Sequence, residues 1–431
     1  MKLKNLGFFL LLIVVFGCKK EDNNVPEILF TKPSANQTFS VSDSINVSAI
    51  VSDDNAIREI QLCLVNENRL AVSKNYIFKA TTNPYLLDFQ YPIDNEMLSS
   101  GKYYLRIKAY DNDNAVKNKY QEIYINELPK ELKNIVVIKK SGVHIIVEML
   151  DSSFQSTLWN PIYTDFSAAA IDSKNQQLII AGNIIGDIVA YNTETQTANW
   201  SIASIPNPPF PFCTHLCVEN NEVLISLYYD NLFKIYSSSG SLIQSTPTDI
   251  PDFYPVFAYK SSYYYIVGIR GISGANAIML LHPSSLYMHN CHFISHKIIA
   301  LFDYDHDAVF CFGNNAGQGI MEIYKISDNN SWTPHTIPNG EIYDVAEIAK
   351  GEYYIAHTNG LYKYKYFNNS LVQILSSTNP RKIAYDKENL VLYMHENTGL
   401  LSSYSMSGIP SLINQQTVND SVLDIQLLFN K

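Results

Sequence analysis

The feature of this chain that most constrains its fold is an internal repeat that occupies the sequence from residue 134 onward. A short, mostly apolar segment recurs at spacings of 38 to 46 residues, and most copies continue with a turn and two further hydrophobic runs. The copies begin at residues 166, 212, 254, 297, 343, 381 and 422, and they read FSAAAIDS, FCTHLCVE, YPVFAYKS, KIIALFDY, YDVAEIAK, RKIAYDKE and VLDIQLLF. A period near 40 residues without a convincing helix is typical of β-propeller blades, whose innermost strands these copies would supply.

The two ends of the repeat region together account for one further blade. The last copy, Val422–Phe429, is followed by no other strand, and three hydrophobic runs without an inner copy precede the first one, at 134–139, 143–150 and 156–159. One strand and three strands make a four-stranded blade. We therefore expect an all-β fold with a seven-bladed β-propeller at 134–431, closed by the C-terminal strand so that no sheet edge stays open.

The repeats resemble the YVTN, WD40-like and quinoprotein-like propellers, although no WD dipeptide or kelch glycine pair occurs. The segment AYNTETQTANW (190–200) resembles one repeat of the pyrroloquinoline quinone type, with Asn192 and Gln196 in place of Asp and Gly. This resemblance implies a shared architecture and no quinone. Trp159, Trp200 and Trp332 fall at one repeat position, where we expect them to anchor the packing of blades. The alternative is a glycan-binding platform.

Residues 26–127 predict a separate β-sandwich. Apolar and polar residues alternate in several short runs, which Asp, Asn, Gly and Pro clusters interrupt. The stretches 50–62 and 100–116 resemble bacterial Ig-like domains, which implies an Ig-like sandwich and a domain boundary between Asn126 and Asn134. The acidic residues of its turns either hold Ca²⁺ or cap their own backbone; they are Asp53, Asp54, Asp111 and Asp113.

The first 25 residues predict a lipid anchor. Lys2 and Lys4 precede nine apolar residues, too few to span a bilayer, and Gly17-Cys18 follows them. The segment 15–18 resembles the lipobox of bacterial lipoproteins, which implies removal of residues 1–17, acylation of Cys18 and a tether at 18–25. An ordinary signal peptide with a chance cysteine is the alternative. Residues 19–22 resemble the export tag of Bacteroidota surface lipoproteins, so we expect an outer-membrane lipoprotein on the cell surface; a charged, solvated tether is the alternative interpretation of these four residues.

Charge and cysteine content exclude some partners. The formal net charge is −10, and it becomes −12 once Lys2 and Lys4 are removed, which argues against nucleic acid. The 30 Tyr and 20 Phe favour strands. Beyond Cys18, an odd number of irregularly spaced cysteines does not form a disulfide framework, so we expect mostly buried thiols. These are Cys63, Cys213, Cys217, Cys291 and Cys311.

Few side chains form a pattern that indicates chemistry. Cys213, His215 and Cys217 share one face of a predicted strand, but their linear spacing is too wide for a tetrahedral zinc site. The histidines of 289–296 and the carboxylates of 303–307 would make a metal or acid–base site only if both lay on one propeller face. The loop 205–212 (IPNPPFPF) is either a contact surface or a rigid connector between blades. The loop 313–319 (GNNAGQG) is rich in glycine but lacks the strand-then-helix setting of a nucleotide-binding loop.

These patterns favour a non-enzymatic binding or assembly protein of the cell envelope with a protein or glycan ligand. The alternative is an envelope hydrolase or lyase with its site at the central pore, since this fold supports both. An enzyme should bring several carboxylates and histidines together from different inner strands. Those strands are mostly apolar, and His215, Glu347 and Asp424 are isolated in the sequence. We therefore expect no catalytic residue, no metal ligand and no cofactor other than the lipid on Cys18.

Overall fold

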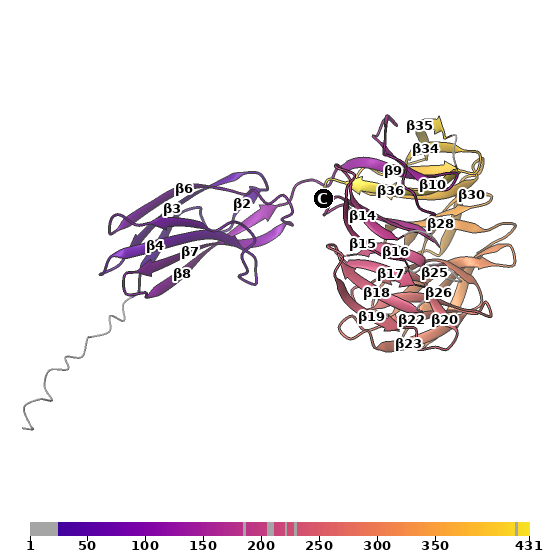
Figure 1. Cartoon of the computed structure of the whole chain (residues 1–431), viewed down its shortest axis with the longest axis horizontal. Coiled ribbons are helices and arrows are strands. Elements are labelled where there is room, and N and C mark those ends of the chain that lie inside the picture. The colour runs from indigo at the N-terminus through magenta and orange to yellow at the C-terminus, as the bar shows by residue number, and fades with distance from the viewer. Residues whose placement is uncertain (1–24, 184–186, 205–210, 220–221, 228–230, 419–420) are drawn as a thin grey trace, which may run out of the picture. The chain divides into compact units, whose positions relative to one another are not determined.

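The computed structural model describes residues 25–183, 187–204, 211–219, 222–227, 231–418 and 421–431. All regular secondary structure in these residues is β-strand, which confirms the expected all-β class. The chain divides between Pro129 and Lys130 into two compact units (Figure 1). The first has one hydrophobic core, and the second has several clusters of buried apolar residues.

The first unit is a sandwich of two sheets. A three-stranded sheet has the order β1-β3-β6, and a five-stranded sheet has the order β2-β8-β7-β4-β5. The strands are β1 (Glu27–Lys32), β2 (Gln37–Ser40), β3 (Ser44–Ser52), β4 (Ile57–Val65), β5 (Tyr76–Lys79), β6 (Tyr85–Pro92), β7 (Gly101–Asp111) and β8 (Val116–Asn126).

The core of this sandwich follows from the period-2 pattern of its strands, because successive side chains of a strand point to opposite faces of its sheet. The apolar residues of β3, β4 and β7 that alternate with polar ones are all buried between the two sheets. They are Ile45, Val47, Ala49, Val51, Ile60, Leu62, Leu64, Tyr103, Leu105, Ile107 and Ala109.

The second unit has the organisation of a β-propeller. Its described residues form seven four-stranded antiparallel sheets, one of which combines strands from both ends of the unit. That sheet has the order β11-β10-β9-β36 and consists of β9 (Leu132–Ser141), β10 (His144–Leu150), β11 (Ser156–Leu158) and β36 (Ser421–Phe429).

The other six sheets each follow the chain order from the innermost strand to the outermost. The strands are β12 (Ala168–Asp172), β13 (Gln177–Ala181), β14 (Ile188–Asn192), β15 (Ala198–Ile202); β16 (Cys213–Glu219), β17 (Glu222–Leu227), β18 (Leu232–Ser237), β19 (Leu242–Pro247); β20 (Phe253–Lys260), β21 (Tyr265–Gly271), β22 (Asn276–Leu281), β23 (Met288–Ile294); β24 (Lys297–Asp303), β25 (Ala308–Asn315), β26 (Gln318–Lys325), β27 (Asn330–Ile337); β28 (Ile342–Ala349), β29 (Glu352–His357), β30 (Gly360–Lys365), β31 (Ser370–Leu375); and β32 (Pro380–Asp386), β33 (Val391–Glu396), β34 (Leu400–Ser405), β35 (Ser411–Thr417).

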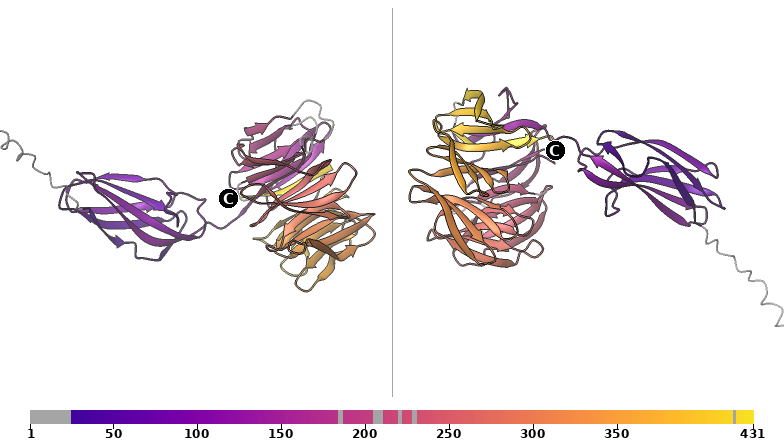
Figure 2. Two further views of the ribbon diagram at one scale, coloured as in Figure 1. Left: turned by 90° about the horizontal axis from the view of Figure 1, so that it is seen from below. Right: turned by 180° about the vertical axis from the view of Figure 1, so that it is seen from behind.

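The C-terminal strand β36 joins the two ends of the propeller unit. It pairs with β9 along nearly its whole length, with Ile425 opposite Val137 and Leu427 opposite Ile135. Figures 1 and 2 show this yellow strand against the purple strands at the start of the unit. Neighbouring innermost strands contact one another in the order β12, β16, β20, β24, β28, β32 and β36, and β36 also contacts β12.

Six of the seven innermost strands carry a β-bulge close to their start. The register shifts there by one residue, which leaves one residue of the innermost strand unpaired. A bulge bends the strand and redirects the following side chains. The unpaired residues are Thr214, Val256, Ile299, Tyr343, Arg381 and Leu423.

The tryptophans pack less uniformly than expected. Trp159 is buried against β9 and β10, and the half-buried Trp200 packs between two sheets while its Nε1–H donates to the Ser238 carbonyl at 2.9 Å. Trp332 remains 44% exposed, so the expectation that it anchors packing is wrong. Its strand, β27, is the outermost of its sheet, and Trp332 belongs to none of the hydrophobic clusters of the described residues.

Candidate functional site

Two adjoining cavities follow the innermost strands of the propeller unit. The larger, which we call the channel, has a volume of about 590 Å³ and is lined by residues from all seven innermost strands or their flanks. The smaller, which we call the mouth chamber, has a volume of about 420 Å³. Both are lined by Ser167, Thr214, Val256 and Ile298, so the two cavities adjoin. The mouth chamber is further lined by Asn183, Pro211, Cys213, Tyr254, Arg270, Asn276 and Lys297.

An ion pair between two neighbouring innermost strands lies in the channel. Lys382 Nζ on β32 lies 3.5 Å from Asp424 Oδ1 on β36. Asp424 also accepts hydrogen bonds from the Ile425 backbone N–H at 3.0 Å and from Gln426 Nε2 at 2.8 Å. The charge of Asp424, assisted by that of Asp344, raises the pKa of Lys382 although burial opposes this shift. Asp424 is therefore not isolated, which corrects the interpretation from sequence.

A second carboxylate, Asp344 on β28, lines the same channel. Its Oδ2 accepts from the Ile383 N–H of the next sheet at 3.0 Å, and its Oδ1 accepts from the Val345 N–H at 3.0 Å. Burial raises the pKa of Asp344, and the nearby Lys382 opposes this rise. The bulges explain the convergence, since Asp344, Lys382 and Asp424 each directly follow the unpaired residue of their own strand.

His215 occupies the equivalent position on β16. Its Nδ1 accepts a hydrogen bond from the Ala258 N–H at 3.2 Å, and its ring lies 4.2 Å from that of Phe257 between centroids. Burial, with a smaller contribution from Lys382, lowers the pKa of His215 to about 4. The imidazole is therefore neutral at pH 7, and its proton resides on Nε2 because Nδ1 is an acceptor. His215 likewise has a structural partner.

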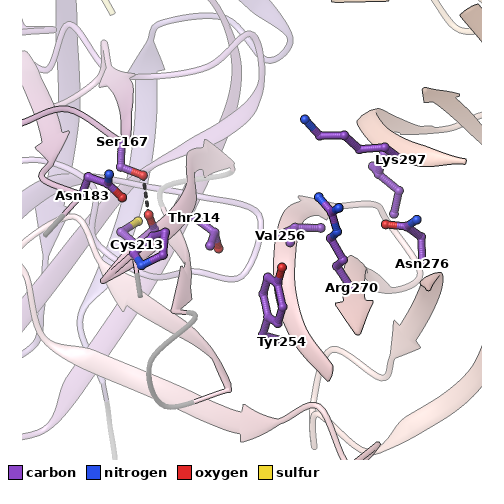
Figure 3. Close-up of a pocket in the computed structure, with 11 residues that line it drawn as sticks. Ser167, Asn183, Cys213, Thr214, Tyr254, Val256, Arg270, Asn276 and Lys297 are labelled. Carbon is purple, nitrogen blue, oxygen red and sulfur yellow. Dashed lines mark hydrogen bonds between the residues drawn. The ribbon is translucent and has the colours of Figure 1, made fainter. Parts of the chain in front are cut away.

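The mouth chamber combines two cationic side chains with no carboxylate among the described residues that line it. Arg270 lies near the end of β21 opposite Asn276, and Lys297 begins β24. Figure 3 shows the charged ends of Arg270 and Lys297 and the hydroxyl of Tyr254 directed into one space. Within the described residues, neither cation forms an ion pair.

The polar groups around these cations differ in how many of their hydrogen-bond donors and acceptors already have partners. Asn276 is 7% exposed; its Nδ2 donates to the Gly274 carbonyl at 3.0 Å, while its Oδ1 has no partner among the described residues. On the opposite wall, Ser167 donates to the Cys213 carbonyl (Figure 3). The Thr214 hydroxyl donates to a carbonyl oxygen, with that of Pro255 at 2.6 Å and that of Ser226 at 3.0 Å. The two hydroxyl oxygens therefore remain available as acceptors.

Carboxylates and lysines also gather near the ends of the innermost strands. Lys387 Nζ lies 3.3 Å from Glu347 Oε2, and Lys350 pairs with Asp303. Burial, followed by the charges of Glu347 and Asp303, raises the pKa of Glu219 to about 7. Glu347 is therefore not isolated either.

The two acid–base segments at 289–296 and 303–307 do not form one site. His296 Nδ1 lies 3.2 Å from Glu322 Oε2, and His296 Nε2 lies 3.3 Å from Cys311 Sγ. This is the order of a nucleophile, a base and an acid, but Cys311 has no exposed surface and burial raises its pKa well above the ordinary value. Asp305 instead accepts from the backbone N–H groups of its own turn.

The described cysteines outside this group are also free thiols. Burial raises the pKa of Cys213 to about 12 and that of Cys217 well above its ordinary value. The bulge between Cys213 and His215 breaks the regular alternation that would have placed these residues on one face. Among the described residues, no group of three His, Cys, Asp or Glu side chains could hold a metal ion.

The acidic turns of the first unit act as backbone caps. Asp53 Oδ1 accepts from the Asn55 N–H at 2.8 Å, and Asp111 Oδ1 accepts from the Ala115 N–H at 2.7 Å. Asp113 accepts from the Asn55 side chain at 2.6 Å. The turn interpretation therefore accounts for these contacts.

Several predicted features lie outside the described residues. These are Cys18 with the leader and tether, and 205–210 of the proline-rich loop. Pro211 lines the mouth chamber, and Phe212 is buried. Residues 313–319 include the hairpin between β25 and β26. No helix in the described residues is long and apolar enough to cross a membrane.

With this geometry established, comparison with known proteins supports the division of the chain. Residues 26–118 match the bacterial Ig domain family. The N-terminal sandwich is thus Ig-like. No curated protein sequence matches the chain.

The propeller unit is similar to several solved structures at low sequence identity. A Lactobacillus plantarum protein shares 14% identity at a TM-score of 0.54, covering 69% of this chain and 100% of its own. A proposed 6-phosphogluconolactonase from Bacteroides uniformis shares 12% identity at a TM-score of 0.50, covering 68% and 98%. The WD40 β-propeller domain of Doa1 gives 12% identity and a TM-score of 0.46, covering 61% and 85%. At such identities, the two stronger matches indicate the fold alone.

Sequence reasoning missed Arg270 and Lys297. Neither belongs to a motif, and they are 27 positions apart in the chain. The available signal was that Lys297 opens an inner strand whose next five residues are apolar. Only the packing of sheet β20–β23 beside sheet β24–β27 brings the two cations to one cavity.

Proposed function

We propose that the chain is a non-enzymatic binding protein whose propeller takes a protein or glycan ligand at the mouth chamber. One contrast carries this proposal. The charged groups of the channel are already partnered, whereas the cationic groups at its mouth have no ion-pair partner among the described residues. Unused charge in a concave, solvent-reachable cavity is typical of a binding site.

The alternative is an envelope enzyme that acts at the channel. The convergence of Asp344, Lys382 and Asp424 in the channel favours this enzymatic function more strongly than the sequence did. Each carboxylate, however, accepts two hydrogen bonds, and the low pKa of His215 makes it a weak base. A general base works best with a pKa near the working pH, which His215 lacks, and both carboxylates are already engaged by backbone hydrogen-bond donors.

Saturation-transfer difference NMR on the Cys18→Ser chain separates the two functions. The probes are D-glucose, D-glucuronate and maltotriose, each followed for a day. We expect saturation transfer to at least one probe, loss of it in Val256→Trp, and no new resonances. Val256 lines both cavities, so an indole there blocks their junction. The matched control is Val372→Trp, whose site on β31 is 55% exposed.

Two results would count against this function. Conversion of a bound probe that stops in Val256→Trp would establish the enzyme instead. Saturation transfer that persists unchanged in Val256→Trp would remove the mouth chamber as the binding site, and its absence for every probe would exclude a glycan of these kinds as the ligand.

We further propose how the whole chain is arranged. Its seven four-stranded sheets act as the blades of one seven-bladed ring, and the Ig-like unit is a spacer. Acyl chains on Cys18 hold the mature protein to the outer membrane, on the cell surface as in the Bacteroidota lipoproteins that residues 19–22 resemble. Two or more chains give firm attachment, whereas one is marginal. Mass spectrometry of the mature N-terminus tests this, and an unmodified Cys18 would exclude it.

A further inference from the structure

We propose that the mouth chamber binds an anionic group, a carboxylate or a phosphate, carried by a small polar ligand. This inference rests on the proposed binding function and specifies its ligand class. Arg270 and Lys297 provide the counter-charge.

The charge of the chamber is opposite to that of the chain. The protein carries a formal net charge of −10, yet the described residues that line this cavity include two cations and no carboxylate. Other lysines of this protein pair with carboxylates, as Lys260 does with Glu222 at 2.7 Å and Lys325 does with Asp328 at 2.7 Å. Leaving two cations together without such partners raises the local potential and attracts an anion.

The backbone fixes the positions from which the side chains of Arg270 and Lys297 extend into the chamber. Arg270 pairs with Asn276 in the β21–β22 ladder, and Lys297 begins β24, one position before the Ile298 that lines both cavities. Their charged ends point into the same space (Figure 3). A guanidinium presents a planar pair of donors that matches two oxygens of a carboxylate or phosphate, and an ammonium adds a third contact.

The surrounding groups suit a ligand that also bears hydroxyls. Asn276 is more than nine-tenths buried, and its Oδ1 has no partner among the described residues. Thr214 and Ser167 already donate to carbonyls and can accept. Acceptors beside an anion site bind the hydroxyl groups of a uronic acid or a sugar phosphate. The volume of about 420 Å³ fits a ligand of this size.

Isothermal titration calorimetry on the Cys18→Ser chain tests this assignment with D-glucuronate, D-glucose 6-phosphate and D-glucose. We expect one or both anionic sugars to bind and D-glucose to bind at least tenfold more weakly. Arg270→Gln and Lys297→Gln should each weaken binding of the anion by about tenfold or more, which is the usual loss for one charge-assisted hydrogen bond. Lys140→Gln, a loss of the same charge at an exposed position outside both cavities, should change it less than twofold. Retention of the wild-type melting temperature shows that each variant is folded.

The outcomes distinguish a failure of the anion assignment from a failure of the proposed binding function. Binding of D-glucuronate alone or of D-glucose 6-phosphate alone identifies the source of the anion and supports the inference. Equal binding of D-glucose, lost in Val256→Trp but unchanged in Arg270→Gln and Lys297→Gln, overturns the anion assignment and leaves the binding function intact. Binding of an anion that no chamber variant alters overturns the site. Absence of binding for all three sugars overturns the ligand class.

Discussion

Single residues in the propeller show how this fold accommodates charge near its centre. Lys382 is about one-third exposed and lies between two carboxylates that also accept backbone hydrogen bonds. Such a partly buried group needs both its ion pair and its hydrogen bonds to offset desolvation. The charged groups of the channel therefore have a structural role, because their contacts connect β28, β32 and β36. This is why the same residue types would be a poor catalytic set.

Glu219 provides a residue-scale prediction for stability against pH. Its folded pKa of about 7 lies above its unfolded value near 4.5, so folding favours the neutral acid. This contribution to stability is fully present below pH 4.5 and is lost as the pH rises through about 7. Glu219→Gln keeps a neutral side chain of the same shape. It should raise the free energy of unfolding by about 1–3 kcal/mol at pH 8 and change it little at pH 4.

Urea unfolding at pH 4, 6 and 8 measures this effect. Glu388→Gln removes the same charge from an exposed position and is the control. If Glu219→Gln and the control give the same difference between pH 4 and pH 8, Glu219 is ionised in the folded state, and the cluster with Glu347 and Asp303 is more solvated than its burial implies.

At the scale of elements, the bulges decide which side chains reach the channel and which residues the neighbouring strand can tolerate. Opposite the bulge of β24, Gly313 pairs with Ile298. A Cβ atom on Gly313 would lie 2.1 Å from the Lys297 carbonyl oxygen and 2.3 Å from His296 Cδ2. The backbone carbonyl cannot move away without breaking the ladder.

Gly313→Ala should therefore destabilise the propeller. Overpacking of this kind costs about 1–3 kcal/mol, and a contact with backbone favours the upper end of that range. Gly408→Ala is the control, since a Cβ there meets nothing within 4 Å. Differential scanning calorimetry should show a lower propeller transition for Gly313→Ala alone. Equal transitions in the two variants would mean that the bulge relaxes at little cost.

Most strands were predictable from local pattern, whereas the site was not. All seven repeat segments coincide with innermost strands, and the alternating residues of β3, β4 and β7 are buried, because period 2 directly encodes a face. The bulges could not be predicted from the sequence, since no residue type distinguishes an unpaired residue such as Thr214 from its paired neighbours. Bulges place Asp344 and Lys382 together, and blade packing places Arg270 beside Lys297. Both arrangements depend on contacts between separate repeats.

At the scale of the whole molecule, the propeller unit depends on its C-terminal strand, β36. β36 supplies the innermost position of a sheet whose other strands come from 132–158, and it contacts both β32 and β12. Ile425 and Leu428 are almost fully buried, and Val422 and Leu427 pack against the same region. Closure by this strand leaves the innermost edge of β9 paired, which avoids an exposed edge that could template aggregation.

Deletion of 421–431 should therefore unfold or aggregate the propeller although only eleven residues are lost. Burial of each large apolar side chain contributes roughly 1.5–3 kcal/mol, so the loss of Ile425 and Leu428, with part of Val422 and Leu427, approaches the 5–15 kcal/mol stability of a typical domain. Calorimetry of the truncated chain should retain one transition, matching that of the isolated fragment 25–129, because the Ig-like core is built entirely from its own strands. A truncated chain whose propeller still melts within a few degrees of the full protein would show that β36 is peripheral. The ring would then consist of the six remaining sheets, and 134–165 would be a linker.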